Sequence, residues 1–253
     1  MNIIEKESLA CTSEQIIQYP DIVCREIRNP LRVLTKESRN NLIIKASEVL
    51  EKTTCEKFVL SVGKQGIEKF IFGALDRGRV LFIFEKDNKM IGFDSINLLN
   101  DGNNYFRFKG STVLHFSSGH ILPEYQGNNY ILRSTRDYVE NLSYENKPRF
   151  IEGFTQNPRV LRLITKFVRG RIVPNSENMD EELLLGQEET LKFIESSGTK
   201  FKRKNNFVLE KKSDIQIYKD KICSGDPAFD RYFYNDLGVN LQTGDLVNFF
   251  AKL

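Results

Sequence analysis

The stretch STVLHFSSGHILPEYQGNNYILRSTRDYVEN, residues 111–141, decides how this chain folds. It predicts a strand with alternating apolar residues, a break at Ser117-Ser118-Gly119, a second short extended piece, a turn rich in Gly and Asn, and then a helix. A strand that leads through a tight turn into a helix directs several backbone N–H groups into one small volume. The positive end of the helix dipole lies there as well. The stretch therefore predicts a cradle for a phosphate group.

The segment ILPEYQGNNYI, Ile121 to Ile131, resembles the acyl-CoA-binding motif of the GNAT superfamily of N-acyltransferases. That motif reads Gln or Arg, two residues, Gly, one residue, and Gly or Ala. Asn129 and Ile131 stand where the family has small residues, but Asn readily accepts a left-handed backbone, so the turn can still form. The resemblance implies acetyl-CoA or another acyl-CoA as co-substrate, and these cofactor-binding residues: Ile121, Leu122, Gln126, Gly127, Asn128, Asn129 and Tyr130.

The remainder of the chain predicts one mixed α/β domain over residues 35–253. Residues 1–34 contain Pro20 and Pro30 and show no sustained hydrophobic period, which predicts an irregular N-terminal extension packed on this domain. The charge-rich residues 175–200 predict a solvated charged insertion with one helix near its end.

Strands joined by tight turns pair antiparallel, so the sequence predicts a meander from Arg79 to Ser118. A strand from Arg149 to Thr155 and a helix opened by Asn157-Pro158 come after the cradle helix. By its resemblance to the GNAT fold, the chain is expected to form a mainly antiparallel twisted sheet with one splayed parallel strand pair, flanked by helices. The splay would receive the pantetheine arm, and Asn157 would contact the cofactor.

Composition limits the classes of function. The 253 residues are 40% apolar and 28% charged, without a long apolar run, which is typical of a globular protein with no membrane span. The net charge of +3 is too balanced to indicate a nucleic-acid partner. Four scattered cysteines without CxxC spacing favour reduced thiols over a disulfide framework or a metal site. The first residues lack a basic start and an apolar stretch, so we expect a cytoplasmic protein.

Both histidines of the chain, His115 and His120, lie in the central strand. Five residues apart, they would face opposite sides of a regular strand, but a bulge at Ser117–Gly119 would bring them to the same face. We expect His120, nearest the cradle, to act as a base or to relay a proton through water, with Glu124 behind it. Local packing is the alternative role. Glu152, on the neighbouring strand, is either a second candidate base or a hydrogen-bonded sheet residue.

Acyl transfer to an amine requires a polarised thioester carbonyl, a deprotonated amine and a protonated leaving thiolate. The GNAT resemblance implies direct attack, since in that family a backbone N–H near the bulge holds the carbonyl. The tyrosine acid of many members is missing, because Leu161, Leu163 and Ile164 occupy that region. The sequence thus predicts an N-acetyltransferase acting on an amine of a small molecule or peptide, or a catalytically silent CoA-binding or interaction module. A homodimer paired through the C-terminal strands is compatible with either function.

Overall fold

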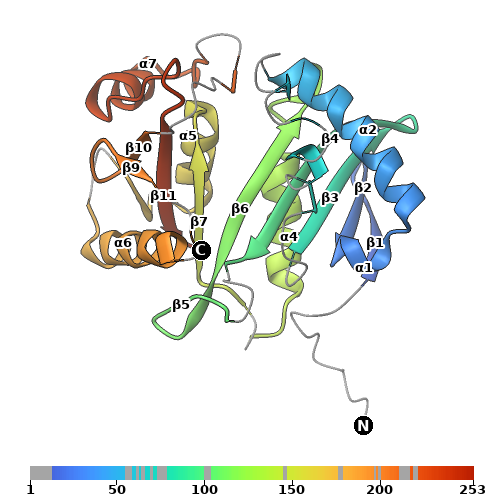
Figure 1. Ribbon diagram of the computed structural model, residues 1–253, viewed down its shortest axis with the longest axis horizontal. Helices are drawn as coiled ribbons and strands as arrows, with labels where there is room; N and C mark the ends of the chain where they lie inside the picture. The colour runs from blue at the N-terminus through green and yellow to red at the C-terminus, as the bar shows by residue number, and fades with distance from the viewer. Residues whose placement is uncertain are drawn as a thin grey trace.

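The computed structural model describes residues 13–54, 59–60, 63, 66–68, 71–72, 79–99, 104–144, 147–175, 179–196, 198, 201–210, 217–218 and 222–253. The elements are β1 (Ser13–Gln18), β2 (Val23–Arg28), α1 (Pro30–Val33), α2 (Lys36–Thr53), β3 (Arg79–Lys86), β4 (Lys89–Leu98), β5 (Arg107–Phe108), β6 (Ser111–Ile121), η1 (Pro123–Tyr125), α4 (Tyr130–Asn141), β7 (Phe150–Thr155), α5 (Pro158–Phe167), β8 (Ile172–Val173), α6 (Glu181–Ser196), β9 (Lys202–Arg203), β10 (Val208–Glu210), α7 (Pro227–Arg231), η3 (Tyr232–Asp236) and β11 (Leu246–Lys252). Their arrangement is drawn in Figure 1.

One twisted sheet organises the described part of the chain. Its strand order is β1-β2-β3-β4-β6-β7-β11-β10-β9, with β5 paired to β6 and β8 paired to β11. Helices α2 and α6 cover one face, and α4 and α5 cover the other (Figure 1). This confirms the predicted fold class, a mixed and mainly antiparallel sheet between helices.

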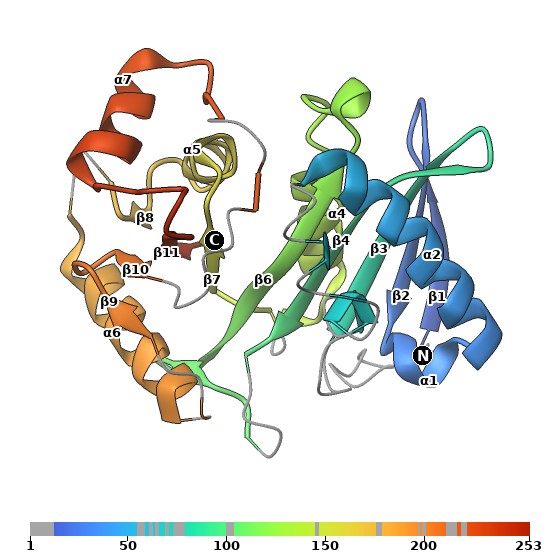
Figure 2. The same ribbon diagram turned by 45° about the horizontal axis from the view of Figure 1, so that its top comes forward.

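The single parallel pair in this sheet is β6 with β7. Their register runs only from Val113 opposite Phe150 to Phe116 opposite Gly153. Beyond these residues β6 and β7 no longer pair with each other, and Figure 2 shows their ribbons diverging. The splayed parallel pair expected from the sequence is therefore present, at the middle of the sheet.

Local sequence explains the elements that frame this splay. Thr35 caps α2, because its side-chain oxygen accepts a hydrogen bond from the Ser38 amide at 3.1 Å. The predicted hairpin forms between β3 and β4, and its turn residues Asp87 and Asn88 have φ values of 50° and 60°, as a two-residue hairpin loop requires. Asn157 caps α5 and Pro158 takes the first helical position, as predicted.

Two predictions about segments at the sheet's flanks are wrong. Residues 13–28 are not irregular: β1 and β2 form a hairpin, and β2 pairs with β3, so this segment extends the sheet. Residues 181–196 are not a solvated excursion, because α6 buries Leu183 and Leu191 and packs against β11. In both segments apolar residues at alternating or helical spacing outweigh the prolines and charges.

The C-terminal strand β11 lies inside the sheet. It pairs with β7 along one edge and with β8 and β10 on the other. The predicted pairing of C-terminal strands across a two-fold axis is therefore wrong for β11, because both of its edges already have partners. Whether the protein forms a homodimer stays a prediction.

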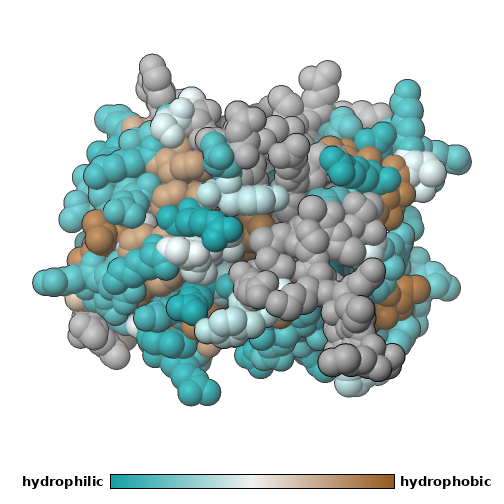
Figure 3. Space-filling view, turned by 90° about the horizontal axis from the view of Figure 1, so that it is seen from below, coloured by the Kyte–Doolittle hydropathy of each residue, from teal (hydrophilic) through white to brown (hydrophobic). Residues whose placement is uncertain are grey.

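The surface in Figure 3 is mainly hydrophilic, with hydrophobic residues in separate patches. Among the helices in the described ranges, none has the length and apolar content needed to cross a membrane. Cys24 and Cys223 are free thiols, whereas Cys11 and Cys55 lie outside the described residues.

Candidate functional site

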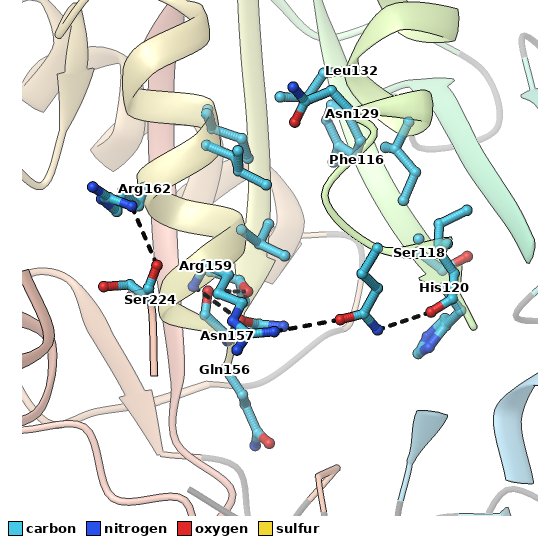
Figure 4. Close-up of a pocket in the computed structure, with 18 of the residues that line it drawn as sticks. Phe116, Ser118, His120, Asn129, Leu132, Gln156, Asn157, Arg159, Arg162 and Ser224 are labelled. Atoms are coloured by element: carbon cyan, nitrogen blue, oxygen red, sulfur yellow. Dashed lines mark hydrogen bonds between the residues drawn. The ribbon is translucent and has the colours of Figure 1, made fainter. Parts of the chain in front are cut away.

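A cleft of about 750 Å³ opens between the unpaired ends of β6 and β7. Its walls come from β6, the loop before α4, the end of β7 and the first turns of α5. Figure 4 shows Ser118 and His120 on one wall and Asn157 and Arg159 on the other. Because the strands part at this point, the cleft reaches residues on both faces of the sheet.

A bulge shapes the β6 wall. Ser95 of β4 pairs with Ser118, but Ile96 pairs with Phe116, so Ser117 is the extra residue. His120 pairs with Phe93, and His115 pairs with Asn97, two positions on β4 that share one face. The predicted bulge is thus confirmed, and it places both histidines on the face covered by α2.

The N-terminus of α4 opens onto the cleft without a cap. Asn129 is its N-cap residue in the left-handed conformation with a φ of 57°, and no side chain caps the helix. Gly127 before it has a φ of 94°, which glycine accepts most easily. Within the described residues, no acceptor is found for the backbone N–H groups of Gly127, Asn129, Tyr130 and Ile131. The Gln126 amide is the exception, since it donates to the Pro123 carbonyl at 3.2 Å.

The predicted cofactor residues divide into two groups. Ile121, Gln126, Gly127, Asn129, Tyr130 and Asn157 line the cleft. Leu122 and Asn128 are not among its lining residues: Leu122 is buried in the core, and Asn128 binds the Tyr125 carbonyl at 3.2 Å.

The side chains of Tyr130 and Ile131, at the start of α4, both point away from the uncapped backbone N–H groups. Tyr130 packs against Phe84 and donates its hydroxyl to Asp21. Ile131, which the sequence placed at a position for small residues, lies against β6: a Cβ on Gly119 would come within 2.8 Å of its Cδ1 atom. The branched side chain therefore packs on the strand.

A basic stripe that sequence reasoning missed faces these amides. Arg159, Arg162 and Lys166 of α5 all line the cleft. Arg159 Nη1 reaches Gln126 Oε1 at 3.5 Å, and Gln126 Nε2 donates to the Ile121 carbonyl at 2.9 Å, so side chains bridge the two walls. The spacing of three and four residues, which marks one helix face, is the sequence signal that could have revealed the stripe.

Asn157 contributes to the cleft at the end of β7. Its Oδ1 atom accepts from the Arg159 amide at 2.9 Å, and its side chain also hydrogen-bonds to the hydroxyl of Tyr218. Burial raises the pKa of Tyr218, so the phenol keeps its proton at neutral pH. Tyr218 lines the cleft and is a candidate acid from a segment where the sequence offered no pattern.

His120 lines the cleft, but its side chain is buried. It is 6% exposed, stacks near Phe93 and has its Nδ1 atom 3.1 Å from the Thr53 hydroxyl. Burial lowers the pKa of His120 to about 4, which makes it neutral but a weak base at pH 7. Glu124, predicted to stand behind it, is exposed on η1 and is not among the lining residues of the cleft.

Glu152 has a partner that was not predicted for it. His115 Nδ1 lies 2.5 Å from Glu152 Oε2. The carboxylate is fully buried, and Asn248 Nδ2 donates to its other oxygen at 3.1 Å. Gln187 of α6 holds the Asn248 carbonyl at 2.8 Å. The His115 side chain is 19% exposed, whereas that of Glu152 is 0% exposed. The buried carboxylate therefore holds an imidazole that is still partly accessible.

His115 and Glu152 are not among the lining residues of the cleft, but they neighbour two that are, Phe116 and Phe154. His115 and Glu152 stand opposite each other in the parallel register, one position before the last paired residues. The ring of Phe154, a lining residue, has its centroid 6.2 Å from that of His115. Among the described residues, no group of His, Cys, Asp and Glu could hold a metal ion.

Comparison with known proteins gives similarities of fold. No protein-family profile matches the chain, and no curated protein matches it. Similar solved structures include a putative GNAT-family acetyltransferase from Desulfovibrio desulfuricans, 12% identical with a TM-score of 0.39, where the match covers 91% of this chain and 98% of that one. The loading GNATL domain of CurA from Lyngbya majuscula is 14% identical with a TM-score of 0.40, over 91% and 97% of the two chains. The PaiA N-acetyltransferase from Thermoplasma acidophilum, in complex with coenzyme A, is 14% identical with a TM-score of 0.37, over 63% and 94%.

Proposed function

We propose that this protein is an acyl-CoA-dependent N-acyltransferase that transfers an acyl group, most simply acetyl, to an amine of a small molecule or peptide. The observation that carries this proposal is the cleft between β6 and β7. Uncapped helix amides and a basic stripe line it, and the His115–Glu152 pair lies next to two of its lining residues, Phe116 and Phe154.

The residues present fit a diphosphate-containing donor such as acyl-CoA. Amides of the Gly127–Ile131 turn offer hydrogen-bond donors at the positive end of the α4 dipole. Arg159, Arg162 and Lys166 supply cations on the facing helix. The cleft between the strands would take the extended arm, whose amide groups can bond to strand edges that lack a partner there.

The donor supplies an activated thioester, and the protein's own groups manage the protons. The His115–Glu152 pair would take the proton from the acceptor amine: a carboxylate beside Nδ1 makes that nitrogen the protonated one and leaves Nε2 as the acceptor. Tyr218, whose phenol stays protonated, is the candidate that returns a proton to the leaving thiolate. In this proposal His115 takes the base role expected of His120, because burial lowers the pKa of His120 and makes it a weak base, and no role is assigned to Glu124, which is exposed on η1.

Backbone geometry would polarise the thioester carbonyl. The bulge at Ser117 frees this part of β6 from regular pairing with β4, and β7 has already separated from it. N–H groups aimed into a cleft that excludes water stabilise developing charge on an oxygen. No side-chain nucleophile is needed for such direct attack.

The second candidate is a catalytically silent CoA-binding module, favoured by Leu161, Leu163 and Ile164 in the region where many members of the resembled family carry a tyrosine acid. Isothermal titration with acetyl-CoA, followed by a thiol-release assay over a panel of amines, separates the candidates. Micromolar binding with thiol release supports the enzyme, and binding without release from any amine supports the silent module. No heat of binding at millimolar acetyl-CoA would refute both.

A further inference from the structure

A buried cation without an ion-pair partner among the described residues lies next to the cleft, where its guanidinium contacts the lining residue Ser117. Arg79, the first residue of β3, is 8% exposed. None of the ion pairs in the described chain includes it, and its Nε atom has no hydrogen-bond acceptor. Its guanidinium bonds only to neutral oxygens, namely Ser95 Oγ at 2.7 Å, the Ile71 carbonyl at 3.4 Å and Ser117 Oγ at 3.5 Å.

In the free protein the buried position of the Arg79 guanidinium is energetically unfavourable. Removing a guanidinium from water is unfavourable unless an opposite charge offsets it. Asp94 attracts the group from the other face of β4, but burial has the larger effect and lowers the pKa of Arg79 to about 10. Arg79 therefore remains charged at neutral pH while it lacks a bound carboxylate.

The position of Arg79 relates it to the reacting groups. Arg79 is paired with Asn97, Asn97 with His115, and His115 with Glu152, so these four residues form one row across β3, β4, β6 and β7. Neighbouring strands are about 4.8 Å apart, which places Arg79 and His115 roughly 10 Å apart along this row. The Arg side chain is long enough to cover much of that distance.

Neutral polar groups connect the guanidinium to the cleft. Ser117 lines the cleft, and its hydroxyl donates to Asn97 Oδ1 at 2.6 Å while it also meets the Arg79 guanidinium. Both Ser117 and Asn97 are partly exposed. An anion that enters between them would find the guanidinium, a hydroxyl and an amide group within reach of one another.

We propose that Arg79, with Asn97 and Ser117, binds a carboxylate of the acceptor, so that the preferred acceptors are amines that carry a carboxylate a few bonds away. This inference rests on the proposed acyltransferase function and names its acceptor class. Arginine suits the role because its planar fork binds both oxygens of a carboxylate. Binding the carboxylate would also place the amine near His115, since the two side chains point to the same face.

The test compares matched acceptors. Glycine, β-alanine and 4-aminobutyrate are each compared with their amides at equal concentrations of unprotonated amine, with acetyl-CoA as donor and thiol release as the readout. The wild type should show kcat/KM at least tenfold higher for the carboxylate in one or more pairs. Arg79→Met should bring that ratio to about one, and Arg79→Lys should retain part of it because a charge remains.

Controls separate this inference from its premise. Acetyl-CoA affinity is measured by titration for every variant, so a variant that fails to fold is recognised. Ser117→Ala, a smaller change, should lower the carboxylate preference severalfold with acetyl-CoA affinity retained. Two results overturn the acceptor assignment but leave the acyltransferase proposal standing. One is turnover by the wild type without a preference for any carboxylate acceptor. The other is a carboxylate preference that survives Arg79→Met. Acetyl-CoA binding without turnover of any pair also overturns it, whereas absent binding overturns the premise.

Discussion

His115 Nδ1 and Glu152 Oε2 lie 2.5 Å apart across the parallel register of β6 and β7, immediately before those strands separate. A fully buried carboxylate thus holds an imidazole that is still accessible. Such a pair resembles the orienting half of hydrolytic triads, where the acid fixes the ring and the ring moves the proton.

Glu152→Gln should lower kcat by roughly 100-fold or more, the usual contribution of a positioned base. The amide oxygen cannot accept from both His115 and Asn248, so the ring loses its orientation. Steady-state thiol release checks this, with acetyl-CoA titration to confirm that the donor site is intact. His115→Gln should have a similar effect.

His120→Gln is the matched comparison on the same strand and face. Because the pKa of His120 is about 4, its titration should not shape the rate profile between pH 6 and 9. We expect less than a tenfold change in kcat and the same profile as the wild type. A loss larger than that of His115→Gln would return the base role to His120.

The fold could be predicted further than the site, and the reason is physical. The central alternating strand, the antiparallel meander from Arg79 to Ser118 and the Asn157-Pro158 helix start are local signals, and each holds in the structure. The pairing of His115 with Glu152 depends on a parallel register between residues 37 positions apart, which no local pattern fixes. The nearness of His120 to the cradle is visible in the sequence, whereas the burial that lowers its pKa is visible only in the packed structure.

Other site residues were hidden for different reasons. Tyr218 enters the cleft from a segment without periodicity, so its role required tertiary contacts. The hairpin at 13–28 is hard to predict from sequence, because Pro20 sits in its turn and proline is common both in turns and in irregular segments. The basic stripe on α5 was readable, since Arg159, Arg162 and Lys166 follow helical spacing.

Lys166→Met and Arg159→Met should each weaken acetyl-CoA binding about tenfold, the usual loss for one charge-assisted contact. The effect should shrink as salt rises, because both side chains are exposed and their field is screened. Titration at 50 and 500 mM NaCl measures it. Lys192→Met on α6, an exposed lysine away from the cleft, serves as the control and should bind like the wild type. Equal affinity for all four proteins would contradict the assignment of the stripe.

Gly153→Ala should destabilise the protein at the point where the strands part. A Cβ atom there would lie 2.7 Å from Phe249 Cζ and 3.0 Å from Phe116 Cβ. Overpacking of this kind costs about 1–3 kcal/mol in the free energy of unfolding. Urea denaturation followed by circular dichroism gives the difference. The double variant with Phe249→Leu should recover part of the loss, and additive losses would show that the ring is not the obstacle.

Asp94→Asn should change how stability depends on pH. Asp94 is fully buried, and burial raises the pKa of its carboxyl group well above the usual value, against the smaller opposing effects of the Ser95 amide and Arg79. The native state therefore binds a proton more tightly than the unfolded chain, whose carboxyl has a pKa near 3.9. The stabilisation is full below that pKa and is lost as the pH rises toward the native value.

Denaturation of the wild type and of Asp94→Asn between pH 4.5 and 8 tests this linkage. The asparagine has no proton to lose, so the variant should gain stability over the wild type as the pH rises across this range. Because the charged residue Arg79 is attracted to Asp94, the gain is reduced at the upper end, but its sign should hold. Parallel curves for the two proteins would mean that Asp94 titrates alike in the folded and unfolded chains, and would contradict a neutral buried carboxyl group beneath α4.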